Sequence, residues 1–60
     1  MREHDKIGLT ILYVEDDSEI REGIATFLNR RVEKLITASN GEEGLELFRQ
    51  YSPDIIITDL

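Results

Sequence analysis

The residues with the clearest potential for chemistry are carboxylates that follow two apolar stretches. Glu15, Asp16 and Asp17 come directly after the apolar run 9–14, and Asp59 follows three isoleucines and a threonine. Carboxylates that crowd together repel one another, and each raises the proton affinity of its neighbours. A hard divalent cation relieves that repulsion, and Mg²⁺ prefers such oxygen ligands with part of its water shell retained. A carboxylate can also act as a nucleophile.

Ordinary structural explanations exist for the same side chains. Asp17 or Ser18 can accept a hydrogen bond from the first free N–H groups of a helix, and this capping role is the favoured interpretation of Asp17. A solvated turn is the ordinary explanation for Asp59, but the isoleucines before it make this the weaker interpretation. His4 has no metal-ligand spacing around it and is interpreted as a solvated tail histidine.

Three predicted strands would position the acids. Residues 9–14 suit a strand buried on both faces, because the run is short, apolar and rich in β-branched and aromatic side chains. Residues 34–38 form a shorter and less apolar strand, as is typical of a sheet edge. Residues 55–58 form the strongest strand signal in the chain and lead directly into Asp59.

Two amphipathic helices connect these strands. The first begins at Asp17 or Ser18 and ends at residues 29–31, where two arginines face the negative end of the helix. Its apolar stripe has helical spacing and consists of Ile20, Ile24, Phe27 and Leu28.

The second helix begins near Ser39 and Glu42, which have the spacing of a capping box, and it ends before Pro53. Gly44 lies on its apolar side. Two explanations for this glycine stay open: a close approach of the helix to the sheet, or a glycine that is merely tolerated.

The alternation of strands and helices predicts an α/β fold with parallel strands and right-handed crossovers. In open parallel sheets, ligands bind at the carboxyl ends of strands, where the strand order reverses. Because residues 15–17 and Asp59 both follow strand ends, we expect the two acid groups to meet at one edge of the sheet.

Composition excludes several classes of function. Thirteen Asp and Glu against seven Lys and Arg give a net charge of −6, which disfavours nucleic-acid binding through this segment. The chain has no cysteine, so it forms no disulfide or thiolate metal site. Short apolar runs and the absence of a signal-peptide pattern predict a soluble, cytoplasmic chain with no membrane partner. The glycine-rich motifs G-x-G-x-x-G and G-x-x-x-x-G-K-[ST] do not occur, which excludes nucleotide binding by a loop of either kind.

Three separated motifs together resemble the receiver domain of response regulators in two-component signalling. They are, in chain order, residues 11–17 (ILYVEDD) with Ile20 and Arg21, residues 38–45 (ASNGEEGL), and residues 53–60 (PDIIITDL). The resemblance implies a flavodoxin-like (CheY-like) doubly wound parallel sheet with strand order 2-1-3-4-5. On this basis residues 1–8 form a polar lead-in, and residues 9–60 form the N-terminal part of a receiver, truncated before its fourth and fifth strands.

The resemblance also implies roles for individual residues. Asp59 would be the phosphoacceptor, taking a phosphoryl group from a sensor histidine kinase. Asp16 would bind Mg²⁺ directly, Glu15 would bind it through water, and Asp59 would complete the set. Many family members have Asp where this chain has Glu15, and the additional methylene suits an outer role. Such a module signals to a downstream effector domain or protein, and it catalyses only its own phosphorylation and dephosphorylation.

Alternative functions use the same residues. A Toprim-like metal-dependent nucleic-acid enzyme domain would use Glu15 and Asp59, but such domains usually follow their Glu with glycine, whereas Asp16 follows here. A second alternative is an interaction module that no longer accepts a phosphoryl group. The presence of Glu15, Asp16 and Asp59 argues against it.

The implied strand order leaves residues 55–58 at an edge, which predicts a homodimer through that strand.

Overall fold

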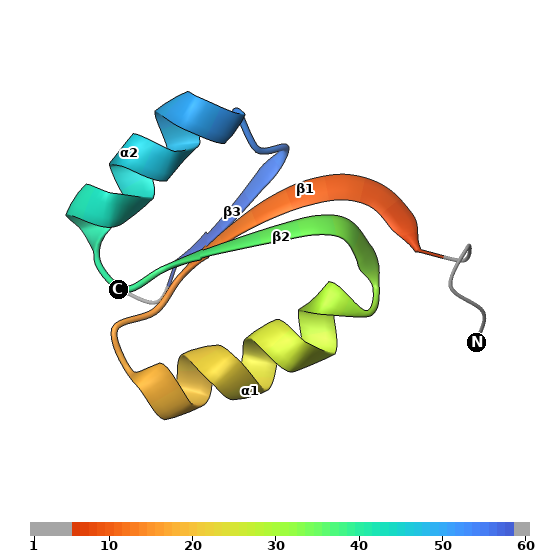
Figure 1. Cartoon of the computed structure of the whole chain (residues 1–60), viewed down its shortest axis with the longest axis horizontal. Helices are drawn as coiled ribbons and strands as arrows, with labels where there is room; N and C mark the ends of the chain where they lie inside the picture. The colour runs from red at the N-terminus through yellow and green to blue at the C-terminus, as the bar shows by residue number, and fades with distance from the viewer. Residues whose placement is uncertain (1–5, 59–60) are drawn as a thin grey trace.

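The computed structural model describes residues 6–58 of the 60-residue chain. Its elements are, in order, β1 (Ile7–Val14), α1 (Ser18–Asn29), β2 (Val32–Ala38), α2 (Gly41–Tyr51) and β3 (Ile55–Thr58). The strands form one parallel sheet in the order β2-β1-β3, with α1 and α2 on opposite faces (Figure 1). The predicted α/β fold with parallel strands is therefore confirmed. No helix within residues 6–58 is long and apolar enough to cross a membrane.

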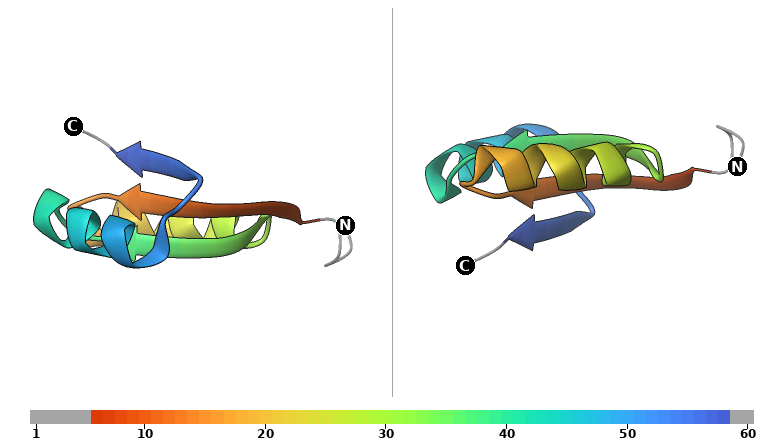
Figure 2. Two further views of the ribbon diagram at one scale, coloured as in Figure 1. Left: turned by 90° about the horizontal axis from the view of Figure 1, so that it is seen from above. Right: turned by 90° about the horizontal axis from the view of Figure 1, so that it is seen from below.

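The core lies around β1, the central strand. Ile11, Leu12 and Tyr13 are buried, as predicted for a strand covered on both faces, and Val32 and Ala38 of β2 complete the set. Figure 2 shows both helices over the β1 and β2 part of the sheet, with β3 to one side. Within the described residues β3 pairs only with β1 and is therefore an edge strand, as the implied strand order predicts. Neither helix packs against it.

Both β1 and β2 begin earlier than the sequence pattern predicts. β1 starts at Ile7 instead of residue 9, and β2 starts at Val32 instead of residue 34. The two new ends support each other, because Ile7 pairs with Val32 and its N–H donates to the Arg31 carbonyl at 2.7 Å. Gly8 interrupts the apolar pattern and lies where the β1–β2 register shifts, between Ile7 and Thr10, which is why hydrophobicity alone misses this extension.

The predicted cap of α1 is confirmed. Asp17 is the N-cap, and its Oδ1 accepts a hydrogen bond from the Ile20 N–H at 3.0 Å. At the other end, Arg30 is the C-cap and Arg31 donates from Nη1 to the Phe27 carbonyl at 3.0 Å. One of the two predicted arginines thus satisfies a carbonyl of the last turn.

The predicted cap of α2 is wrong by one residue. The N-cap is Asn40, whose side chain accepts from the Glu43 N–H at 2.8 Å, while Glu43 Oε1 accepts from the Ser39 N–H at 2.7 Å and the Ser39 hydroxyl at 2.9 Å. Two overlapping pairs offer capping spacing, Ser39 with Glu42 and Asn40 with Glu43. The chain uses the second pair, and the helix accordingly starts at Gly41. The helix ends at Tyr51, and its C-cap, Ser52, adopts a left-handed conformation directly before Pro53.

Of the two explanations for Gly44, the structure supports a close approach of α2 to the sheet. A Cβ atom at this position would lie 3.0 Å from Cγ2 of Val14 and 3.8 Å from Cβ of Ala38. The missing side chain therefore lets α2 pack directly on the carboxyl-terminal ends of β1 and β2.

A pair of hydrogen bonds sets the register of β3. The Thr10 N–H donates to Asp54 Oδ2 at 2.8 Å, and the Asp54 N–H donates to the Thr10 carbonyl at 2.8 Å. The ladder then runs in step from Ile11 beside Ile55 to Val14 beside Thr58. Asp54 therefore determines which residues of β1 and β3 reach the carboxyl edge of the sheet together.

Candidate functional site

Glu15 is the first residue after β1 and is held on several sides. Its N–H donates to the Ala38 carbonyl at 3.0 Å, which continues the β1–β2 pairing beyond the strand. Its side chain is only 4% exposed, and it is the one buried charged residue among those described. Its Oε2 accepts from the Asp17 N–H at 3.1 Å. The Glu15 carboxylate therefore stabilises the turn that leads into α1.

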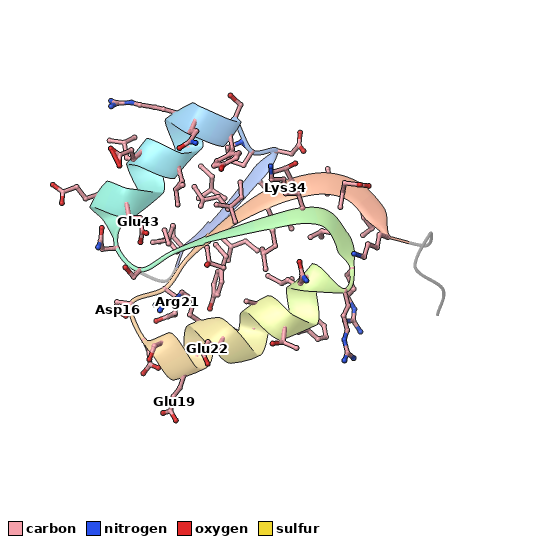
Figure 3. All side chains as sticks on the ribbon, viewed as in Figure 1. Asp16, Glu19, Arg21, Glu22, Lys34 and Glu43 are labelled. Atoms are coloured by element: carbon pink, nitrogen blue, oxygen red, sulfur yellow. The ribbon has the colours of Figure 1, made fainter. Side chains whose placement is uncertain are left out.

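Asp16 differs from Glu15 in every one of these respects. It is exposed, and within residues 6–58 its carboxylate makes no hydrogen bond or ion pair. Figure 3 shows it on the loop between β1 and α1. Of the two neighbouring acids, Asp16 is the one whose oxygens are available to a ligand.

A hollow of about 250 Å³ lies at this edge of the sheet. It is formed by the carboxyl-terminal ends of β1 and β3, the start of the loop after β1, and the segment that leads from β2 into α2. Its lining residues are Val14, Glu15, Asp16, Ser39, Asn40, Gly41 and Thr58. The acids that follow β1 therefore share one hollow with the last described residue of β3. This is the edge at which the sequence predicts the two acid groups to meet.

The structure describes two of the three predicted metal ligands. Glu15 and Asp16 border the hollow together, whereas Asp59 lies outside the described residues, as does His4. Within the described part of the chain, no group of three or more Asp, Glu, His or Cys side chains is close enough to hold a metal ion. The side chains that line the hollow offer oxygen donors and no sulfur or imidazole, and this donor set suits Mg²⁺.

Arg21 supports the loop beside the hollow, a role that its place in the family motif did not indicate. From the first turns of α1, its Nη1 donates to the backbone carbonyl of Glu15 at 2.7 Å. Figure 3 shows the side chain beside the loop that carries Asp16. The available signal was a cation placed four residues after Asp17, where a helical side chain can reach back toward the loop.

Glu43 holds the loop that borders the hollow on the side of α2. Its pKa lies below the ordinary carboxyl value because the Ser39 N–H and hydroxyl both donate to it, and the positive charge of Arg21 lowers it further. These bonds hold the loop between β2 and α2, where Ser39 and Asn40 line the hollow. Both loops that border the hollow are therefore braced by side chains from the start of a helix.

Comparison with known proteins identifies the family. The response regulator receiver domain matches residues 11–60. The transcriptional regulatory protein AfsQ1 of Streptomyces coelicolor is 39% identical over 51 residues, covering 85% of this chain and 23% of that protein. The probable transcriptional regulator ycf27 of Guillardia theta is 42% identical over 50 residues, covering 83% of this chain and 20% of that protein.

A solved structure agrees with both the fold and the sequence. The N-terminal domain of an uncharacterized protein from Wolinella succinogenes superimposes with a TM-score of 0.85 at 43% identity, covering 88% of this chain and 43% of that one. The chain spans less than a quarter of the length of the two curated relatives named above. It belongs to the response regulator receiver domains of two-component systems.

Proposed function

We propose that this chain accepts a phosphoryl group on Asp59 from a sensor histidine kinase. The observation that carries the proposal is the register of β3 on β1. Thr58 pairs with Val14, and these two residues directly precede Asp59 and Glu15 in the sequence. A continued parallel register would bring Asp59 to the edge of the sheet where Glu15 and Asp16 border the hollow.

Mg²⁺ is the cofactor in this proposal. Asp16 would bind the ion directly and Glu15 through water, with Asp59 completing the set. The contrast in burial supports this division, because the Glu15 carboxylate is occupied by the Asp17 N–H whereas that of Asp16 is exposed. When bound, the ion would neutralise part of the charge on the phosphoryl oxygens.

Asp59 would supply the nucleophile. One of its carboxylate oxygens forms a bond to phosphorus while the bond from phosphorus to the kinase histidine nitrogen breaks. The buried β1 end and the braced loops would hold the surrounding groups in place during this transfer. The chain would thus catalyse its own phosphorylation and dephosphorylation, and no other reaction is assigned to it.

The wider role follows from the family. We propose a cytoplasmic location and a downstream effector domain or protein, since two of the relatives are named as transcriptional regulators. The exposed β3 edge is proposed to pair with a second copy of this strand. Sedimentation of the 60-residue chain at micromolar concentration tests that pairing, and a compact monomer would exclude it. The Toprim-like alternative is set aside because the chain belongs to the receiver family.

Intact-mass spectrometry of the full-length protein tests the phosphoacceptor. A small phosphodonor with Mg²⁺ should add one phosphoryl group to the wild type and none to Asp59→Asn. Asp54→Asn is the matched control, because it removes the acid that precedes β3 but keeps an oxygen that can accept from the Thr10 N–H, so it should leave labelling intact. Labelling of Asp59→Asn at the wild-type level would refute the assignment.

Magnesium titration followed by NMR tests the cation site. Asp16→Asn should weaken binding strongly and Glu15→Gln mildly, because only the first removes a proposed inner ligand. Equal binding by Asp16→Asn and the wild type would remove Asp16 from the site.

A further inference from the structure

The loop that carries Asp16 is held by a small set of hydrogen bonds. Glu15 donates its N–H to the Ala38 carbonyl, and its Oε2 accepts from the Asp17 N–H. The remaining backbone group of Glu15, its carbonyl, accepts from Arg21 Nη1 at 2.7 Å. Of these bonds, the one from Arg21 is the single one that ties the loop to a side chain of α1.

Arg21 holds the loop at two points. Its own N–H donates to the Asp17 carbonyl at 2.8 Å, and its guanidinium reaches past that residue to Glu15. Asp16 lies between the two accepting residues, and within residues 6–58 its carboxylate makes no hydrogen bond or ion pair that would orient it. The direction of this carboxylate therefore depends on the backbone that Arg21 holds.

We propose that Arg21 is a positioning residue, which fixes the Glu15 carbonyl and thereby aims the Asp16 carboxylate into the hollow for a divalent cation. This inference rests on the proposed function, because it requires Asp16 to be the inner ligand. Arg21 itself touches neither the cation nor the phosphoryl group in this role.

The sign of one measurement separates positioning from simple charge. A guanidinium near a cation site repels the cation, so removing the charge alone should tighten Mg²⁺ binding. Removing the hydrogen bond should loosen the Asp16 loop and weaken Mg²⁺ binding. Residues that orient metal ligands typically contribute 10- to 100-fold in affinity, so we expect about 10-fold weaker binding in Arg21→Met.

The test is a Mg²⁺ titration of the full-length protein, followed by NMR. Arg21→Met should bind about 10-fold more weakly, and Arg21→Lys should fall between it and the wild type because one donor remains. Arg31→Met is the matched control, since Arg31 also donates Nη1 to a backbone carbonyl of α1, at the end away from the hollow. It should bind like the wild type.

Amide hydrogen exchange without metal provides a second readout. The Asp17 N–H, which donates to Glu15 Oε2 in the same loop, should exchange faster in Arg21→Met but not in Arg31→Met. If Arg21→Met does not fold, the intermediate affinity of Arg21→Lys carries the test. Equal or tighter Mg²⁺ binding by the Arg21 variants would overturn this inference alone. A wild type that binds no Mg²⁺ would overturn the proposed function and this inference with it.

Discussion

β1 and β3 are both short, apolar and followed by acids, yet the fold treats them very differently. In β1, Ile11, Leu12 and Tyr13 are 5%, 1% and 3% exposed, whereas in β3 the three isoleucines are 41%, 48% and 38% exposed. β1 has a strand on each side and a helix on each face, and β3 has one neighbouring strand within the described residues. Burial is therefore decided by position in the sheet and not by the hydrophobicity of the strand.

The same difference divides the candidate site. The acids after β1 lie on a central strand whose end is packed by Gly44 and tied by Glu15. The proposed phosphoacceptor follows a strand that is positioned by its ladder to β1 and by the paired bonds between Thr10 and Asp54. The positions of Glu15 and Asp16 thus depend on packing, whereas the proposed position of Asp59 depends on the register of β3 on β1.

The largest expected difference comes from truncating register partners. Leu12 and Ile56 lie side by side in the sheet. Leu12→Ala should lower the free energy of unfolding by about 2–5 kcal/mol because it leaves a cavity in the core. Ile56→Ala should cost less than about 1 kcal/mol in the 60-residue chain, because its side chain is already half exposed. Urea unfolding followed by circular dichroism measures both, and equal losses would break the comparison.

A second test concerns how tightly the end of β1 is packed. Gly44→Ala should destabilise the chain by about 1–2 kcal/mol, because the new methyl group would press on Val14, a stiff β-branched side chain. Gly23→Ala in α1 is the matched control. Nothing lies within 4 Å of the added Cβ there, so better helix propensity should stabilise by about 0.5–1 kcal/mol. Thermal unfolding of the two variants should shift in opposite directions.

A third test concerns the anchor of β3. Asp54→Ala removes the acceptor for the Thr10 N–H and should cost about 1 kcal/mol. Asp54→Asn keeps an oxygen at that place and should cost less. Hydrogen exchange of the Thr10 amide should accelerate in the alanine variant and much less in the asparagine variant. Unchanged exchange in Asp54→Ala would show that the ladder alone sets the register.

The smallest expected effect is a pH dependence from Glu43, which braces the loop beside the β1 end. Its pKa is lowered by the Ser39 hydrogen bonds, so the ionised form stabilises the fold. That contribution is present above the ordinary pKa of 4.5 and is lost as the pH falls through the lowered value of the folded chain. The stability difference between wild type and Glu43→Gln should therefore shrink below pH 4.5. Glu42→Gln, which removes a charge one residue earlier, should not reproduce the change.

Local patterns in the sequence were sufficient to predict much of the molecule. Short apolar runs between helical stripes predicted the strand and helix order, and the side-chain chemistry of Asp17 identified the cap of α1. Three separated motifs predicted the receiver family, which the family match confirms. Glu15 and Asp16 were identified because acids after a buried strand are chemically unusual, and both border the hollow.

Other features depended on contacts between distant residues. The start of β1 at Ile7 requires a partner at Val32, and the need for glycine at position 44 follows from Val14 lying 3.0 Å from its missing Cβ. The cap of α2 was ambiguous because two overlapping pairs had the right spacing. The sequence determined which segments are strands and which acids follow them. Only the tertiary structure decided how tightly the end of β1 is packed and that Arg21 holds the Asp16 loop, because both depend on which segments pack together and not on the segments themselves.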